Sequence, residues 1–169
     1  MQRAQVVLVD TNIIIEAVRT GCWNAINTHF SIETVEKCCE EARTGEARRP
    51  GYVKVDESAL RTRLTVHKVS GVMLFELAQH YADADRLDAG ERHLWAHALS
   101  RNDEWLAACS YRAAVNAAVR LGWEDRLVSL EELVNAAGAR SASKNLKEQF
   151  RSARLSEWKT AAIIARGLK

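Results

Sequence analysis

The sequence predicts an α/β fold with a central parallel sheet, and three observations support this. Residues Val6–Val9 are apolar without the polar alternation of a half-exposed strand, which is typical of a strand buried on both faces. Asp10 follows directly, and ligands of open parallel sheets bind outside the carboxyl ends of the strands. The 169 residues, 47% of them apolar, fit one domain that buries roughly 70% of its unfolded surface.

Local patterns predict the other elements in chain order. Short apolar runs predict strands at residues 29–32, 105–110 and 127–129, with 52–55 as an extended segment or edge strand. Apolar residues at helical spacing predict helices over residues 13–18, 34–42, 72–81, 87–99, 112–121 and from 130 onward, with a short amphipathic helix over 60–67. Pro50, the only proline, marks the clearest break in the chain.

The last part of the chain differs in charge from the rest. Residues 138–143 form a linker of small residues, so we expect a domain over 1–138 and a C-terminal extension over 139–169. The extension is predicted to be helical and amphipathic enough to dock. Its net charge is +6, which leaves −4 for residues 1–138. An acidic body with a basic tail fits a polyanionic partner once a metal neutralises the acids.

Other features exclude several classes of protein. The four cysteines lack the paired spacing of zinc sites, so we expect them to be reduced and partly buried. His93 and His97 stand one helical turn apart, but no third ligand has a fitting spacing, and a zinc site is not predicted. Without a signal sequence or an apolar stretch of about 18 residues, we expect a cytoplasmic protein with no membrane partner.

The opening strand and the residues after it, Asp10-Thr11-Asn12 and an apolar continuation, resemble the start of PIN-domain proteins, a family of metal-dependent ribonucleases. The resemblance covers about residues 5–134. It implies a three-layer α/β/α fold with a parallel sheet. It also implies three or four carboxylates that meet at one end of the sheet and hold Mg²⁺ or Mn²⁺.

The resemblance implies a ligand set in which Asp10 is the first acid. Glu91 is the third, because Leu-Asp-Ala-Gly-Glu before an alanine-rich helix resembles the third-acid segment of a PIN subgroup. Glu36 best matches the second acid, which follows its strand closely, and Glu40 on the same helix face is the substitute. Asp10, Glu36 and Glu91 are thus the expected catalytic and metal-binding residues.

Each of these acids also has a structural interpretation. Asp10 can cap the following helix, and Glu91 in a first turn gains from the helix dipole by about 0.3–1 kcal/mol. The acidic run that contains Glu36 can solvate a helix face and pair with Lys37 and Arg43. The two interpretations remain open at the level of sequence.

Three polar residues complete the expected site. Thr11 and Asn12 can hydrogen-bond the acids or a phosphate oxygen, or satisfy backbone groups where strand turns into helix. Where PIN proteins commonly carry a fourth acid, at the end of the strand over 105–110, this chain has Ser110. A serine can position a metal-bound water but supplies no charge.

The resemblance leads us to expect a Mg²⁺- or Mn²⁺-dependent endoribonuclease that hydrolyses phosphodiester bonds of RNA. If the protein is the toxin of a toxin–antitoxin pair, it requires an antitoxin partner and forms a homodimer. The alternative is a catalytically weakened PIN-like module that binds RNA or a protein, because Ser110 replaces the fourth acid. No glycine-rich phosphate loop follows the first strand, which argues against a nucleotide-binding protein.

Overall fold

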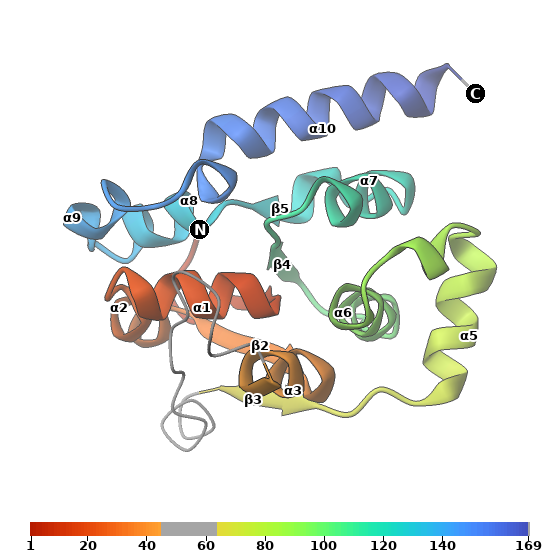
Figure 1. The fold of residues 1–169 in the computed structure, drawn as a ribbon, viewed down its shortest axis with the longest axis horizontal. Helices are drawn as coiled ribbons and strands as arrows, with labels where there is room; N and C mark the ends of the chain where they lie inside the picture. Colours follow the sequence, from red (N-terminus) through yellow and green to blue (C-terminus); the bar gives the residue numbers. More distant parts are fainter. Residues whose placement is uncertain (45–63, 169) are drawn as a thin grey trace.

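The computed structural model describes residues 1–44 and 64–168 and contains a five-stranded parallel sheet (Figure 1). The strand order is β3-β2-β1-β4-β5, so β1 lies at the centre. The strands are β1 (Val6–Val9), β2 (Ser31–Val35), β3 (Thr65–His67), β4 (Trp105–Ala108) and β5 (Leu127–Val128). All four neighbouring pairs are parallel, which confirms the predicted α/β fold with a parallel sheet.

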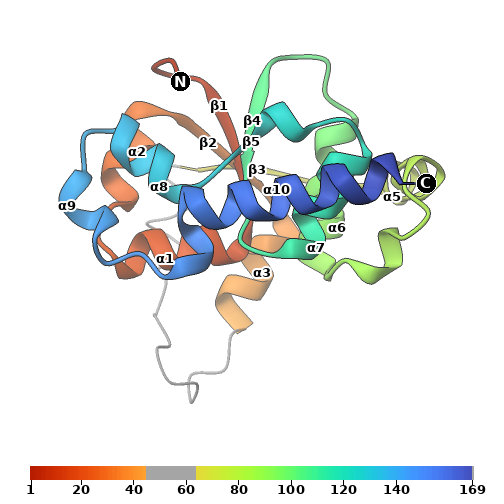
Figure 2. The ribbon, with the colours of Figure 1, turned by 90° about the horizontal axis from the view of Figure 1, so that it is seen from above.

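Helices cover both faces of the sheet, which gives the expected three layers (Figure 2). One face is covered by α1 (Thr11–Arg19), α2 (Trp23–His29) and α8 (Leu130–Ala136). The other is covered by α6 (Ala89–Leu99) and α7 (Arg112–Arg120), with α5 (Gly71–His80) packed on α6 and α10 (Ser152–Gly167) packed on α7. The helix α3 (Glu36–Thr44) contacts both layers, since Cys38 and Cys39 belong to different apolar clusters. Shorter elements are η1 (Ala84–Arg86), η2 (Glu124–Arg126), α9 (Arg140–Ser143) and η3 (Glu148–Phe150).

The central strand β1 is buried on both faces, as its composition predicts. Leu8 packs among the side chains of the α6 and α7 layer, whereas Val7 and Val9 pack among those of the α1 and α2 layer. All three side chains are fully buried. Since neighbouring side chains of a strand point to opposite faces, an unbroken apolar run is what two covering layers require.

Two predicted elements differ in the structure. β2 continues to Val35, because the residues beyond 32 pair with β3 and the Thr34 hydroxyl donates a hydrogen bond to the Val9 carbonyl at 2.6 Å. The predicted helix over 60–67 is wrong at its end, where residues 65–67 form β3 and pair with β2. Tertiary pairing overrides the local helical spacing there. The predicted extended segment at 52–55 lies outside the described residues.

The C-terminal extension is helical and packs on the rest of the protein. Phe150 is buried in the α1 and α2 layer, and Leu155 in the α6 and α7 layer. The Glu16 carboxylate of α1 accepts a hydrogen bond from the Lys147 backbone N–H at 2.9 Å, and Arg19 donates one to the Asn145 carbonyl at 2.6 Å. The extension therefore contributes core side chains, while the domain boundary at residue 138 stays a prediction.

None of the helices in the described parts of the chain combines the length and apolar character that a membrane span needs. The four cysteines are free and buried, in agreement with the expected reduced state. Their burial raises the pKa of Cys38 to about 12, and it places the thiol of Cys109 well above its usual pKa. These thiols therefore act as small apolar groups in the core.

Replacement of a buried aromatic residue in the extension tests whether this segment belongs to the core. Phe150 is 4% exposed, so Phe150→Ala is expected to lower the free energy of unfolding by about 3–5 kcal/mol. Phe75 on α5 is 64% exposed, and the matched Phe75→Ala change should stay within about 0.5 kcal/mol of wild type. Denaturant titrations of both variants measure the difference, and equal effects would mean that the extension does not contribute to the core.

Candidate metal centre

Asp10 holds together the carboxyl end of the sheet. It is 2% exposed, and it caps α1 by accepting a hydrogen bond on Oδ1 from the Ile13 N–H at 2.8 Å. Its Oδ2 accepts a hydrogen bond from the Ser110 N–H, just beyond β4, at 3.3 Å. The capping role is therefore realised, and the same carboxylate also joins two neighbouring strand ends.

Glu91 lies in the first turn of α6, and one of its carboxylate oxygens has no hydrogen-bond partner among the described residues. Asp88 caps this helix and accepts a hydrogen bond from the Glu91 N–H at 2.7 Å. Glu91 is only 5% exposed, and its Oε1 is buried without a hydrogen-bond partner among the described residues. A buried polar atom in this condition costs about 1–3 kcal/mol, unless something absent from the protein chain satisfies it.

Glu41 connects these two acids from α3. Its Oε2 accepts a hydrogen bond from the Thr11 hydroxyl at 3.0 Å, and its Oε1 accepts one from the Gly90 N–H at 2.9 Å. Thr11 follows Asp10 in the chain and Gly90 precedes Glu91, so Glu41 lies at the starts of both helices. The glycine permits this close approach, because a Cβ at position 90 would collide with Oε2 of Glu41 and would force that carboxylate to move.

Electrostatic coupling shows that the acids lie near one another. Burial, together with the negative charges of Asp88, Asp10 and Glu41, raises the pKa of Glu91 to about 8. Burial also raises the pKa of Asp10 to about 7, with a contribution from Asp88 and against the hydrogen bonds from Ile13, Ser110 and Asn12. The cluster thus gathers acidic groups, and no described cationic side chain is among the main influences on Asp10 and Glu91.

The structure brings Asp10 and Glu91 into this centre but leaves Glu36 outside it. The Glu36 side chain is 46% exposed and lies 4.0 Å from the Lys68 ammonium. Glu40 is 52% exposed and pairs with Lys37 at 3.0 Å, as the structural interpretation of the acidic run expects. Sequence reasoning preferred Glu36 and Glu40 to Glu41, which stands on the same helix. It missed Asp88 as a neighbouring carboxylate.

The polar residues predicted beside the acids have different roles. Thr11 binds Glu41 and donates to the Cys38 carbonyl at 3.1 Å, which fixes α3 against α1. The Asn12 backbone N–H donates a hydrogen bond to Asp10, which slightly lowers the pKa of that acid. Ser110 is 2% exposed, and its backbone N–H is what reaches Asp10. No carboxylate follows β4 at this point of the chain, in keeping with the sequence.

A different cluster has its ligand atoms closer together. Glu33 of β2, His67 of β3 and His97 of α6 each offer one ligand atom, and these atoms lie within 4.8 Å of one another, an arrangement that could hold a metal ion. In the described parts of the chain, this is the one group of three such residues within that limit. The His67 and His97 rings stack at 4.1 Å. Sequence reasoning missed this cluster, because the partners of His97 lie on β2 and β3, far from it in the sequence.

Arg101 already fills the cationic position of that cluster. Its Nη1 donates to Glu33 Oε2 at 2.6 Å and to His97 Nε2 at 3.1 Å, and His67 Nε2 lies 2.7 Å from the same carboxylate oxygen. Burial, then the charges of His67 and Arg101, lower the pKa of His97 to about 4. A metal ion would have to displace a paired guanidinium there, whereas in the described part of the chain no cationic side chain appears among the main influences on Asp10 and Glu91.

The donor set around Asp10 fits a hard divalent cation. Mg²⁺ and Mn²⁺ prefer oxygen ligands, and Asp10, Glu41 and Glu91 offer only oxygens, one of them buried without a partner. Their carboxylates are more widely spaced than the cluster around His97. Mutual repulsion of like charges without a cation favours such spacing.

Comparisons with known proteins do not assign the chain to a family. A scan against models of protein families found no match, and a search of curated proteins found none either. The functional assignment therefore depends on the motifs of the sequence and on the geometry of these two clusters.

The raised pKa values predict how the metal-free protein responds to pH. Asp10 and Glu91 keep protons in the folded state that they lose in the unfolded state, so the free energy of unfolding should fall as pH rises toward 8. The fall attributable to both acids between pH 6.5 and about 8.5 is about 3 kcal/mol. His97, with its lowered pKa, acts in the opposite direction, but that effect is complete above pH 6.5.

Asp10→Asn provides the comparison, because asparagine also caps helices well but does not ionise. Denaturant titrations in a chelator at several pH values should give a smaller fall for Asp10→Asn than for wild type. The difference between the two proteins cancels the titration of the cysteines. Parallel pH profiles for the two proteins would contradict the raised pKa of Asp10.

Proposed function

We propose that the protein is a Mg²⁺- or Mn²⁺-dependent endoribonuclease whose metal is held by Asp10, Glu41 and Glu91. The observation that carries the proposal is the buried, unpartnered carboxylate oxygen of Glu91 in the field of Asp10 and Glu41. Burial of several carboxylates is costly without a cation, which a divalent ion would supply. The resemblance of Asp10-Thr11-Asn12 to the PIN opening supports the same class.

Each residue of the chain has a defined task in this proposal. Asp10, held by the Ile13 and Ser110 N–H groups, presents its carboxylate between β1 and β4. Thr11 orients Glu41, and the Asp88 cap fixes the turn that carries Glu91. A divalent ion bound there supplies charge neutralisation for a phosphate and lowers the pKa of an attacking water. At neutral pH the raised pKa of Glu91 means that metal binding must release a proton.

RNA as the substrate is supported by the charge distribution and by the PIN resemblance. The extension carries +6 and the rest of the chain −4, so metal binding would leave a surface suited to a polyanion. In the toxin form of the proposal, the partners are an antitoxin and a second copy of the chain. Exposed apolar side chains on α5, Val72 and Phe75, support a protein partner.

A catalytically weakened PIN-like module is the second candidate, and Ser110 is the observation that favours it. The end of β4 supplies a backbone N–H where the PIN pattern expects a carboxylate. Such a protein would bind metal and RNA without cutting RNA. Metal affinity and cleavage therefore have to be measured on the same preparation.

The assignment of the second acid gives a sharp mutational test. Cleavage of single-stranded RNA with Mn²⁺ should fall by about 10–100-fold or more in Asp10→Asn and Glu41→Gln, because each loses a charged oxygen ligand. Glu36→Gln is the matched control on α3 and should retain activity, since its side chain is 46% exposed. Equal cleavage by wild type and Asp10→Asn would indicate a contaminating nuclease, and a larger loss in Glu36→Gln than in Glu41→Gln would restore Glu36.

Gly90 tests the geometry of the site without removal of a charge. In Gly90→Ala the new Cβ displaces the flexible end of Glu41, so Mn²⁺ affinity should fall by about 10-fold or more while the protein stays folded. Gly71→Ala is the matched control, because nothing lies within 4 Å of a Cβ at that position. Calorimetric titration measures both affinities, with melting temperatures recorded in parallel.

The same titration separates the two clusters. Loss of Mn²⁺ binding in His97→Gln, but not in Asp10→Asn or Gly90→Ala, would assign the metal to Glu33, His67 and His97. If Gly90→Ala is the one variant whose Mn²⁺ affinity stays unchanged, Glu41 is not a ligand.

A further inference from the structure

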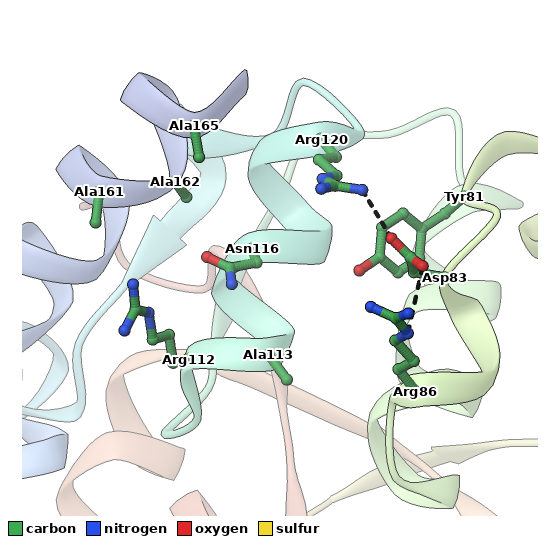
Figure 3. A pocket seen from close by; sticks show the side chains of 10 residues that line it. All are labelled: Tyr81, Asp83, Arg86, Arg112, Ala113, Asn116, Arg120, Ala161, Ala162 and Ala165. Carbon is green, nitrogen blue, oxygen red and sulfur yellow. Dashed lines mark hydrogen bonds and ion pairs between the residues drawn. The ribbon is translucent and has the colours of Figure 1, made fainter. Parts of the chain in front are cut away.

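A polar hollow lies between α7, α10 and the turn that follows α5 (Figure 3). Its volume is about 220 Å³. The polar side chains that line it are Tyr81, Asp83, Arg86, Arg112, Asn116 and Arg120. None of them belongs to the centre around Asp10.

The hollow results from the patterns of two helices. Arg112, Asn116 and Arg120 recur at every fourth position of α7, so they share one face of that helix. The facing side of α10 offers only methyl groups, from Ala161, Ala162 and Ala165 (Figure 3). Because alanine fills little space, the polar side chains of α7 border an open volume instead of packing against α10.

The charges in this hollow are not balanced. Arg120 donates to Asp83 at 2.8 Å, and the Arg86 Nε lies 3.5 Å from the other oxygen of the same carboxylate. The lining therefore holds three guanidinium groups and one carboxylate, and two of the three pair with it. The Arg112 guanidinium has no hydrogen bond or ion pair with the described ranges 1–44 and 64–168. Within those ranges it differs in this from Arg86 and Arg120.

We propose that this hollow binds a phosphate of the RNA strand whose neighbouring phosphodiester lies at the centre around Asp10. Arg112 stands two positions after Ser110, and the Ser110 N–H binds Asp10, so α7 leads from one site to the other. A guanidinium matches the paired oxygens of a phosphate, and the Asn116 amide adds donors on the same face. The inference rests on the proposed function and names a contact of the same substrate.

The other arginines near α10 are less suited to this task. Arg151 pairs with Glu131, Arg154 with Glu148 and Glu157, and Arg166 with Glu124. These pairs must be broken before the guanidinium groups can bind a phosphate. Three of the eight basic residues of the extension are thus held in ion pairs within the described ranges, and Arg112 is the arginine lining the hollow that no such pair holds.

The test is the salt dependence of binding of a single-stranded oligoribonucleotide to the full chain in a chelator. Loss of one phosphate contact reduces the slope of log affinity against log salt by about 0.7 for a single strand. Arg112→Ala should show this reduction with a weaker affinity at low salt. Arg3→Ala is the matched control, because Arg3 is exposed and precedes β1 at the opposite end of the sheet, and it should bind like wild type.

A second pair of variants adds a negative charge instead of removing a positive one. Ala165→Glu places a carboxylate at the hollow and should weaken RNA binding, whereas Ala153→Glu puts the same charge at an exposed site in the first turn of α10 and should not. If Arg112→Ala binds the oligoribonucleotide with the same affinity and salt slope as Arg3→Ala, the inference is wrong. Displacement of the RNA by micromolar inorganic phosphate would also overturn it, because a site for the free ion would then explain the arginines.

The outcome is independent of catalysis. Normal Mn²⁺-dependent cleavage with unchanged binding in Arg112→Ala would refute the phosphate contact and leave the nuclease. A reduced salt slope in Arg112→Ala without cleavage under any metal condition would refute the nuclease and leave the RNA contact.

Discussion

The structure depends on a carboxylate that is buried where three elements meet. Asp10 closes β1, caps α1 and receives the backbone N–H that follows β4, so one side chain fixes the two strand ends and a helix start. The same burial keeps its pKa near 7, far above that of a solvated aspartate. A residue whose only role was to cap a helix could lie at the surface, where its carboxylate would not lose its hydration. Burial of this acid therefore connects three elements, but it also makes the charged form of the carboxyl group less stable than it is in water.

The two titratable clusters show two solutions to the burial of a carboxylate. Glu33 is paired with Arg101 and His67, so its charge is satisfied within the chain. Glu91 has no such partner for one oxygen and stands beside other acids. Buried charges are usually paired or bind metals, and only the second cluster lacks a pair in the described residues. The tighter geometry of the first cluster is thus evidence of a completed ion-pair network, which is why close spacing alone does not identify a metal centre.

The sequence allowed the central part of this architecture to be predicted because the signals there are local. β1 has an unbroken apolar run, and Asp10 and Glu91 follow recognisable strand and helix starts. Glu36 and Glu41 flank the apolar face of α3 on opposite sides, so helical spacing cannot decide between them. The packing of α3 against Thr11 and Gly90 decides it. The strand β3 escaped prediction for a similar reason, because three residues at 65–67 become a strand only through pairing with β2.

The order of the strands has a consequence for the synthesis of the chain. β1 is made first, yet it is the middle strand, and one of its neighbours, β4, begins about 95 residues later at Trp105. A ribosome-bound chain therefore holds an apolar strand with one edge unpaired until most of the protein has emerged. Such an edge is a template for pairing with other chains, so the nascent protein is exposed to aggregation during that interval. The Asp10 carboxylate, which needs the N–H beyond β4, would stay hydrated and acidic throughout that interval and become buried only when the last strands close over it.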